Sequence, residues 1–77
     1  MTVQEFLLNA WYSQKVAIID LNQKQLYDAL KDEKTLKEIS LFFGDNWQTR
    51  SDLYKPIKKM EVSDYGVIDN TLVIEVK

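Results

Sequence analysis

The sequence predicts an α+β domain with the element order α-β-β-α-β-β, in which an antiparallel sheet of about four strands carries two helices on one face. Apolar residues recur at helical spacing in two segments, 3–10 and 33–43. Runs of β-branched apolar residues bounded by turn residues lie between these segments and at the C-terminal end. Residues 1–77 are expected to form a single domain.

The first helix is expected at about residues 3–10. Thr2, followed three residues later by Glu5, has the spacing of a capping box, in which each side chain accepts a hydrogen bond from a backbone N–H at the helix start. One apolar stripe follows at positions i, i+3, i+4 and i+7, made of Val3, Phe6, Leu7 and Ala10.

Two strands and a second helix are expected in the middle of the chain. The segment KVAIIDLNQKQLYDAL predicts strands near 15–21 and 25–29, joined by a turn at Asn22-Gln23. From Asp32 the pattern changes to acids followed by apolar residues at helical spacing, which predicts a helix over about 33–43 that stops at Gly44. The polar segment DNWQTRSDLY then predicts a connecting loop, and Pro56 predicts the start or edge of a strand.

A hairpin is expected to close the chain. Its first strand lies within residues 57–68, where Gly66 indicates a bulge or bend, and Asp69-Asn70 forms the turn. On the last strand, alternation predicts three residues facing the core and two facing water: Leu72, Ile74 and Val76 against Thr71 and Glu75. Val73 interrupts this alternation, which indicates that the second face of the strand is also partly covered, by a helix or by a partner.

Composition excludes several classes of protein. With 45% apolar residues and nine aromatics, the chain has the composition of a globular domain. It has no cysteine, which rules out disulfides, and no run near the roughly 18 apolar residues that span a bilayer. The N-terminal segment lacks the features of a signal peptide, so a cytoplasmic protein without membrane partners is expected. A net charge of −2 makes nucleic acid an unfavourable partner.

Catalytic and metal-binding motifs are not evident. The chain has no histidine, and none of its serines lies in a Gly-x-Ser-x-Gly elbow. Asp20 and Asn22 imitate the start of a calcium loop, but Lys24, Gln25 and Lys31 stand where that loop needs an acid or amide, a glycine and a glutamate. We therefore expect no enzyme activity, no cofactor and no bound metal.

The aromatic residues carry more information about function. Trp11 is expected to pack in the core at the helix end, whereas Trp47 fits equally a lid over the core and an exposed anchor. Exposed Trp and Tyr are typical of protein interfaces. The candidate partner-binding residues are Tyr12, Asp45, Trp47, Tyr54, Asp64 and Tyr65.

Three stretches, TVQEFL, VAIIDLNQKQLYDAL and KKMEVSDYGVIDNTLVIEVK, resemble small uncharacterised proteins carried by phages and prophages of Gram-positive bacteria. The resemblance covers about half of the chain and supplies no catalytic residues. It implies a genetic setting in which small acidic proteins frequently bind a host protein, with anti-CRISPR inhibitors as a prominent class. The resulting hypothesis is a non-enzymatic protein that occludes or traps a host protein. The alternative is a homo-oligomeric structural or accessory phage protein, such as a homodimer.

Overall fold

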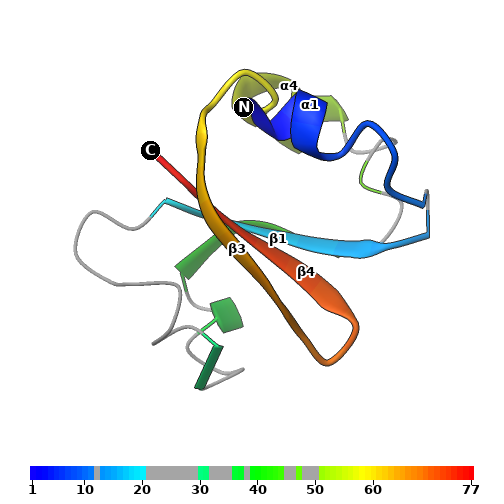
Figure 1. The fold of residues 1–77 in the computed structure, drawn as a ribbon, viewed down its shortest axis with the longest axis vertical. Helices are drawn as coiled ribbons and strands as arrows, with labels where there is room; N and C mark the ends of the chain where they lie inside the picture. The colour runs from blue at the N-terminus through cyan, green and yellow to red at the C-terminus, as the bar shows by residue number, and fades with distance from the viewer. Residues whose placement is uncertain (12, 21–29, 32–35, 38, 45–46, 48–50) are drawn as a thin grey trace.

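The computed structural model describes residues 1–11, 13–20, 30–31, 36–37, 39–44, 47 and 51–77. Four strands and two helices are defined within these residues (Figure 1). In chain order they are α1 (Val3–Phe6), β1 (Lys15–Asp20), β2 (Ser40–Gly44), α4 (Ser51–Ile57), β3 (Val62–Ile68) and β4 (Thr71–Val76).

The described strands form one mixed sheet in the order β2-β1-β4-β3. β2 pairs with β1 and β3 pairs with β4 in antiparallel fashion, but the two central strands, β1 and β4, run parallel, from Lys15 opposite Thr71 to Asp20 opposite Val76. The prediction of an antiparallel sheet is therefore wrong. Alternation of apolar and polar residues within one strand does not predict which strand lies beside it or in which direction. β1 and β4 are far apart in the sequence and meet only in the folded sheet.

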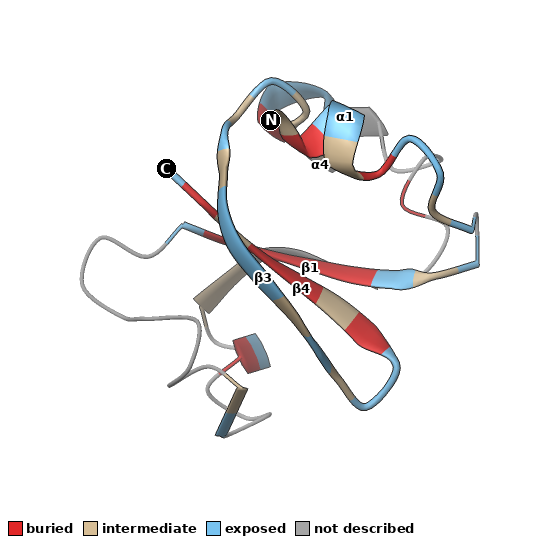
Figure 2. Cartoon of the chain, viewed as in Figure 1, coloured by how far each residue is buried: buried red, intermediate tan, exposed pale blue. Residues whose placement is uncertain are grey.

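The two central strands are covered on both faces, as a parallel pair requires. Four consecutive residues of β1 are fully buried: Val16, Ala17, Ile18 and Ile19. On β4, residues on both faces of the strand are buried (Figure 2). The continuous apolar run in β1 is thus typical of a strand that is buried on both faces.

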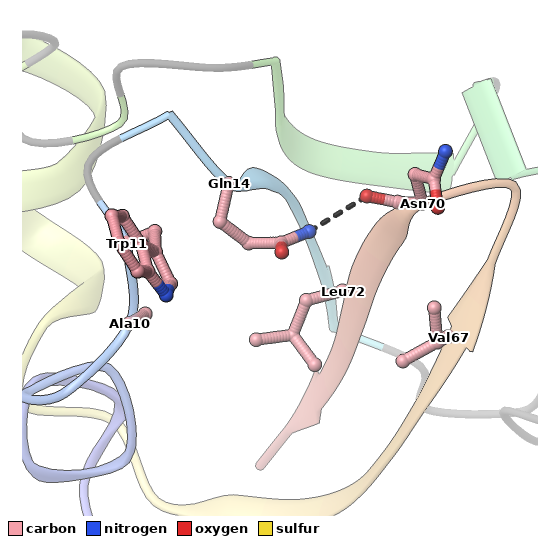
Figure 3. A pocket seen from close by; sticks show the side chains of 6 residues that line it. All are labelled: Ala10, Trp11, Gln14, Val67, Asn70 and Leu72. Atoms are coloured by element: carbon pink, nitrogen blue, oxygen red, sulfur yellow. Dashed lines mark hydrogen bonds between the residues drawn. The ribbon is translucent and has the colours of Figure 1, made fainter.

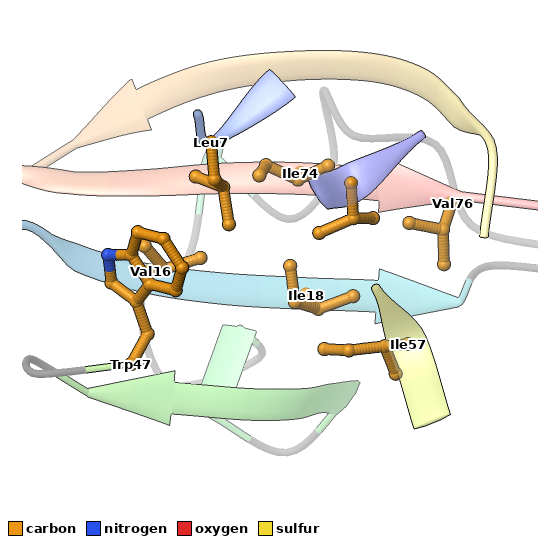
Figure 4. Close-up of a cluster of buried hydrophobic side chains, with 8 residues drawn as sticks. Leu7, Val16, Ile18, Trp47, Ile57, Ile74 and Val76 are labelled. Carbon is orange, nitrogen blue, oxygen red and sulfur yellow. The ribbon is translucent and has the colours of Figure 1, made fainter. Parts of the chain in front are cut away.

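The first face of the sheet packs against α1 and α4 (Figure 4). The cluster here consists of Val3, Leu7, Val16, Ile18, Trp47, Ile57, Ile74 and Val76. On β4, Ile74 and Val76 are buried, and half-buried Leu72 packs against the same cluster, which confirms the predicted core-facing side of the last strand.

The second face of the sheet carries a smaller cluster made of Ala17, Ile19, Leu36 and Val73, with Leu30, Ile39 and Ile68 packed against it. Val73 is fully buried. The prediction that this face is partly covered is confirmed, and residues of the same chain provide the cover. Thr71, which was expected to face water, lies on this side and is also buried.

The middle of the chain departs most from prediction. The expected strand at 25–29 lies outside the described residues. Of the helix predicted over 33–43, residues 36–37 and 39 are helical, but residues 40–43 and the predicted stop at Gly44 form β2, because Phe42 and Phe43 pair with Ile18 and Ala17 of β1. Residues 51–57, assigned to a loop and a strand start, form α4 with Pro56 as its penultimate residue. Pro56 has no backbone N–H, so α4 lacks the i→i−4 hydrogen bond at this position, and the helix ends one residue later.

The N-terminal capping box is present as predicted, but α1 ends earlier than residue 10. Glu5 N–H donates to Thr2 Oγ1 (3.2 Å), and Thr2 N–H donates to Glu5 Oε1 (3.0 Å). The helix then stops at Phe6, with Leu7 as its C-cap at φ −89° and ψ 2°. The chain beyond Leu7 therefore leaves the helix. Half-buried Ala10 still packs against the cluster on the first face, whereas Trp11 is exposed.

Titration of Glu5 should report on this capping box. The backbone N–H and the hydroxyl of Thr2 lower the pKa of Glu5 below its ordinary value of 4.5. A carboxylate with a lowered pKa stabilises the fold above the unfolded-state value, and this stabilisation is lost as the pH falls through the folded-state pKa. The stability advantage of the wild type over Glu5→Gln should thus be present above pH 4.5 and shrink below it. Chemical denaturation at several pH values measures it, and a pH-independent difference would contradict the capping role.

The C-terminal hairpin turns at Asp69-Asn70, as predicted. Both residues have positive φ, 47° and 61°, which is the geometry of a two-residue type I′ turn. The pairing beyond the turn places Ile68 opposite Thr71 and Val67 opposite Leu72, with a register shift between Val62 and Asp64. This turn fixes the face that each residue of β3 occupies.

Candidate protein-binding surface

Three large apolar side chains are exposed near β3. Trp11 is 82% exposed, Val67 is 66% exposed and Tyr65 is 58% exposed. The prediction that Trp11 packs in the core is wrong, because α1 stops before it. We call Trp11, Tyr65 and Val67, with half-buried Phe6 and Leu72 beside them, the Trp11 surface.

Strand register explains why these side chains share one face. Residues directly opposite one another in an antiparallel pair point to the same side of the sheet, so Val67 lies beside Leu72, and Tyr65 beside Ile74. Leu72 and Ile74 face α1, and α1 in turn brings Phe6 to Tyr65, with ring centroids 4.8 Å apart. The Trp11 surface is thus the outer, uncovered continuation of the main core.

A pocket of about 280 Å³ is the concave part of this surface (Figure 3). It is lined by Ala10, Trp11, Gln14, Val67, Asn70 and Leu72. The Gln14 side chain joins its two sides, since Nε2 donates to the carbonyl oxygens of Lys15 (3.0 Å) and Asn70 (2.7 Å). These hydrogen bonds connect the loop that carries Trp11 to the β3-β4 turn. They therefore fix the two sides of the pocket relative to each other.

The acidic side chains of β3 and its flanks define the charge of this edge. Glu61, Asp64 and Asp69 are exposed, and no lysine or arginine occurs between residues 60 and 70. Glu61 pairs with the amino group of Met1 at 2.8 Å, whereas Asp64 Oδ1 accepts a hydrogen bond from the N–H of Tyr65 at 2.8 Å. Asp64 and Asp69 form no ion pair within the described part of the chain.

The predicted site residues are distributed unevenly. Tyr65 belongs to the Trp11 surface, whereas Asp64 is paired with Glu75 and lies on the other face of the sheet; both are exposed. Trp47 is only 2% exposed and belongs to the core, so it is not a surface anchor. Tyr12 and Asp45 lie outside the described residues. Sequence reasoning missed Trp11, Val67 and the pocket. The signal that was available for Val67 is its spacing of two residues from Tyr65, which puts both side chains on one face of the strand.

Tyr54 supports Trp47 rather than forming a site of its own. The two rings are 5.2 Å apart, and burial raises the pKa of the Tyr54 hydroxyl. Together with Gln4, Leu7 and Leu8 they line a second pocket of about 200 Å³. The indole Nε1 of Trp47 is buried and donates no hydrogen bond to any residue that the structure describes.

Two properties of the described residues bear on other functions. These residues contain no group of three or more acidic, histidine or cysteine side chains placed to hold a metal ion. None of the helices among them has the length and apolar character to cross a membrane.

Comparison with known proteins adds no relative. No protein-family model, curated protein or solved structure matches this chain.

Proposed function

We propose that this chain is a non-enzymatic, phage- or prophage-encoded protein that occludes or traps a host protein, in the manner of an anti-defence inhibitor. The observation that carries the proposal is the Trp11 surface. Trp11 has 82% of its surface exposed, and an exposed valine and tyrosine lie beside it. Removing this apolar surface from water by binding a partner would be favourable. Trp and Tyr are also the residues that most often dominate binding energy at protein interfaces.

The sequence supports a binding role over catalysis. It has no histidine and no cysteine, so the most common general base and the most reactive nucleophile are missing. The concave part of the Trp11 surface is lined by apolar groups and amides, with no carboxylate or amine among its lining residues. Such a lining suits recognition of an apolar side chain.

Binding of a host protein can be tested with matched surface variants. The immobilised wild-type protein should retain a host protein from a lysate, and the same two proteins should bind each other after purification. Trp11→Ala and Val67→Asp should each weaken this binding by about tenfold or more, as expected for substitutions at an interface centre. Leu8→Asp is the matched control, because Leu8 is 75% exposed but does not line the Trp11 pocket.

Two results would contradict the proposal. One is a host protein that binds Trp11→Ala as tightly as the wild type. The other is a stable oligomer in solution that buries Trp11, seen as a multiple of the 9.1 kDa chain mass and as quenching-resistant Trp11 fluorescence. That second result would favour a homo-oligomeric accessory protein.

A further inference from the structure

We infer that the outer edge of β3 is the site at which the partner binds, through an extended, basic segment that adds to the sheet as a further strand. This inference rests on the proposed function and specifies the chemistry of the partner. It follows from three observations: the position of β3, the direction of its free backbone groups and its charge.

β3 is the last strand on its side of the described sheet, and the N-terminal segment covers the beginning of its outer edge, where Val62 N–H donates to the carbonyl of Met1 (2.8 Å). The edge beyond this point, at Tyr65 and Val67, is the part considered for an added strand. In a two-residue hairpin the pair that closes the turn, Ile68 with Thr71, is hydrogen-bonded, and hydrogen-bonded and non-hydrogen-bonded pairs then alternate. The N–H and C=O groups of Val67 and Tyr65 therefore point away from β4. The hydrogen bond from Tyr65 N–H to Asp64 Oδ1 agrees with this direction, because a ladder N–H would donate to β4 instead.

The residues with outward backbone groups are also those with exposed apolar side chains. Val67 and Tyr65 lie on the Trp11 face of the sheet, and Val67 lines the pocket. An added strand would gain backbone hydrogen bonds from these two residues. Its side chains on the same face would lie against Tyr65 and Val67 at the rim of the pocket, so one surface supplies both backbone affinity and side-chain selectivity.

The acidic charge of the β3 edge favours a basic partner over a second copy of this chain. Two β3 strands paired through Tyr65 and Val67 would place Asp64 opposite Ile68 of the second copy, next to the second copy's Asp69. This pairing would leave Asp64 against an apolar residue and without a cation, whereas Lys or Arg on the added strand would pair with Asp64. The carboxylate of Asp64 now protects the N–H of Tyr65, and a basic segment can replace it with a backbone carbonyl while neutralising its charge.

A model peptide tests the inference with the full-length protein. The probe is the capped hexapeptide Lys-Val-Lys-Val-Lys-Val, and its charge-reversed control is Glu-Val-Glu-Val-Glu-Val. The basic peptide should shift the backbone amide resonances of Tyr65 and Val67 and slow exchange of the Val67 amide by about tenfold or more at saturation. The acidic peptide should do neither.

Two further comparisons isolate the backbone and the charge. Methylating the amides of one alternate set of peptide residues blocks the edge that faces β3, while methylating the other set leaves it free. The two methylated peptides should therefore differ in affinity by about tenfold or more. Asp64→Asn keeps an oxygen that can accept from Tyr65 N–H but removes the charge. It should weaken binding at low salt, and the difference should disappear at high salt.

The outcomes separate this inference from the proposed function. If the basic peptide does not bind at β3, or the two methylated peptides bind alike, strand addition is overturned, and the proposed function still stands wherever Trp11→Ala abolishes binding of the host protein. If Trp11→Ala leaves the host protein bound, the proposed function fails whatever the peptide does. Self-association of the wild type through β3 would also overturn the inference, in favour of a second copy.

Discussion

Val73→Asp is expected to unfold the protein. Val73 lies on a central strand with none of its surface exposed, packed with Ala17, Ile19 and Leu36 on the second face of the sheet. A carboxylate there would lose its hydration without gaining a described partner, at a cost of several kcal/mol. A chain of 77 residues has a total stability of only about 4–12 kcal/mol. Circular dichroism should show loss of the cooperative thermal transition.

Val67→Asp is the matched control for this experiment. It makes the same chemical change on the neighbouring strand β3, but Val67 is 66% exposed, so its effect on stability should stay within about 0.5 kcal/mol. An intact spectrum for Val73→Asp together with a change in molecular mass would mean that the second face is covered by another molecule rather than by Leu36. Equal melting temperatures for the two variants would contradict the described core.

Local signals in the sequence were sufficient where the structure depends on neighbours in the chain. The capping box of Thr2 and Glu5 and the turn at Asp69-Asn70 each involve residues within a few positions, and both are present. Val73 indicated a second buried face because it is apolar at a position where a strand with one face in water would carry a polar residue. These features need no knowledge of which strands pair.

Features that depend on distant contacts were not predictable in the same way. The short apolar run at residues 40–44 fits a helix end and a strand equally, and pairing with β1 decides between them. The parallel pairing of β1 and β4 likewise joins the two ends of the chain.

The two tryptophans show the same limit for the candidate site. Helical spacing continued from Val3 would have kept Trp11 on the buried stripe, but the helix ends at Phe6, and the side chain becomes exposed. Trp47 has polar neighbours in the sequence, and only its contacts with Tyr54 and the main core make it a buried residue. Of the aromatic residues named as candidates, Tyr65 is exposed, and Trp11 is exposed in place of Trp47; their role in binding stays a prediction.

Trp47→Ala is expected to cost about 3–5 kcal/mol, because it removes the largest fully buried side chain of the main core. Trp47→Phe should cost clearly less. Phenylalanine keeps a ring against Tyr54, and it also removes the indole N–H, which is buried without a hydrogen-bond acceptor. An unsatisfied buried donor costs about 1–3 kcal/mol, so its removal offsets part of the lost packing.

Urea denaturation of the two variants measures this difference, with Trp11→Ala as the control that should change stability by no more than about 0.5 kcal/mol. Since the chain has two tryptophans, Trp47→Phe leaves Trp11 as the only indole, and its fluorescence should be red-shifted and readily quenched by acrylamide. Trp11→Phe should leave the blue-shifted, protected emission of Trp47. If Trp47→Phe destabilises the protein as much as Trp47→Ala, the indole N–H makes a stabilising hydrogen bond in solution. That outcome would contradict the finding that this N–H is buried without an acceptor among the described residues.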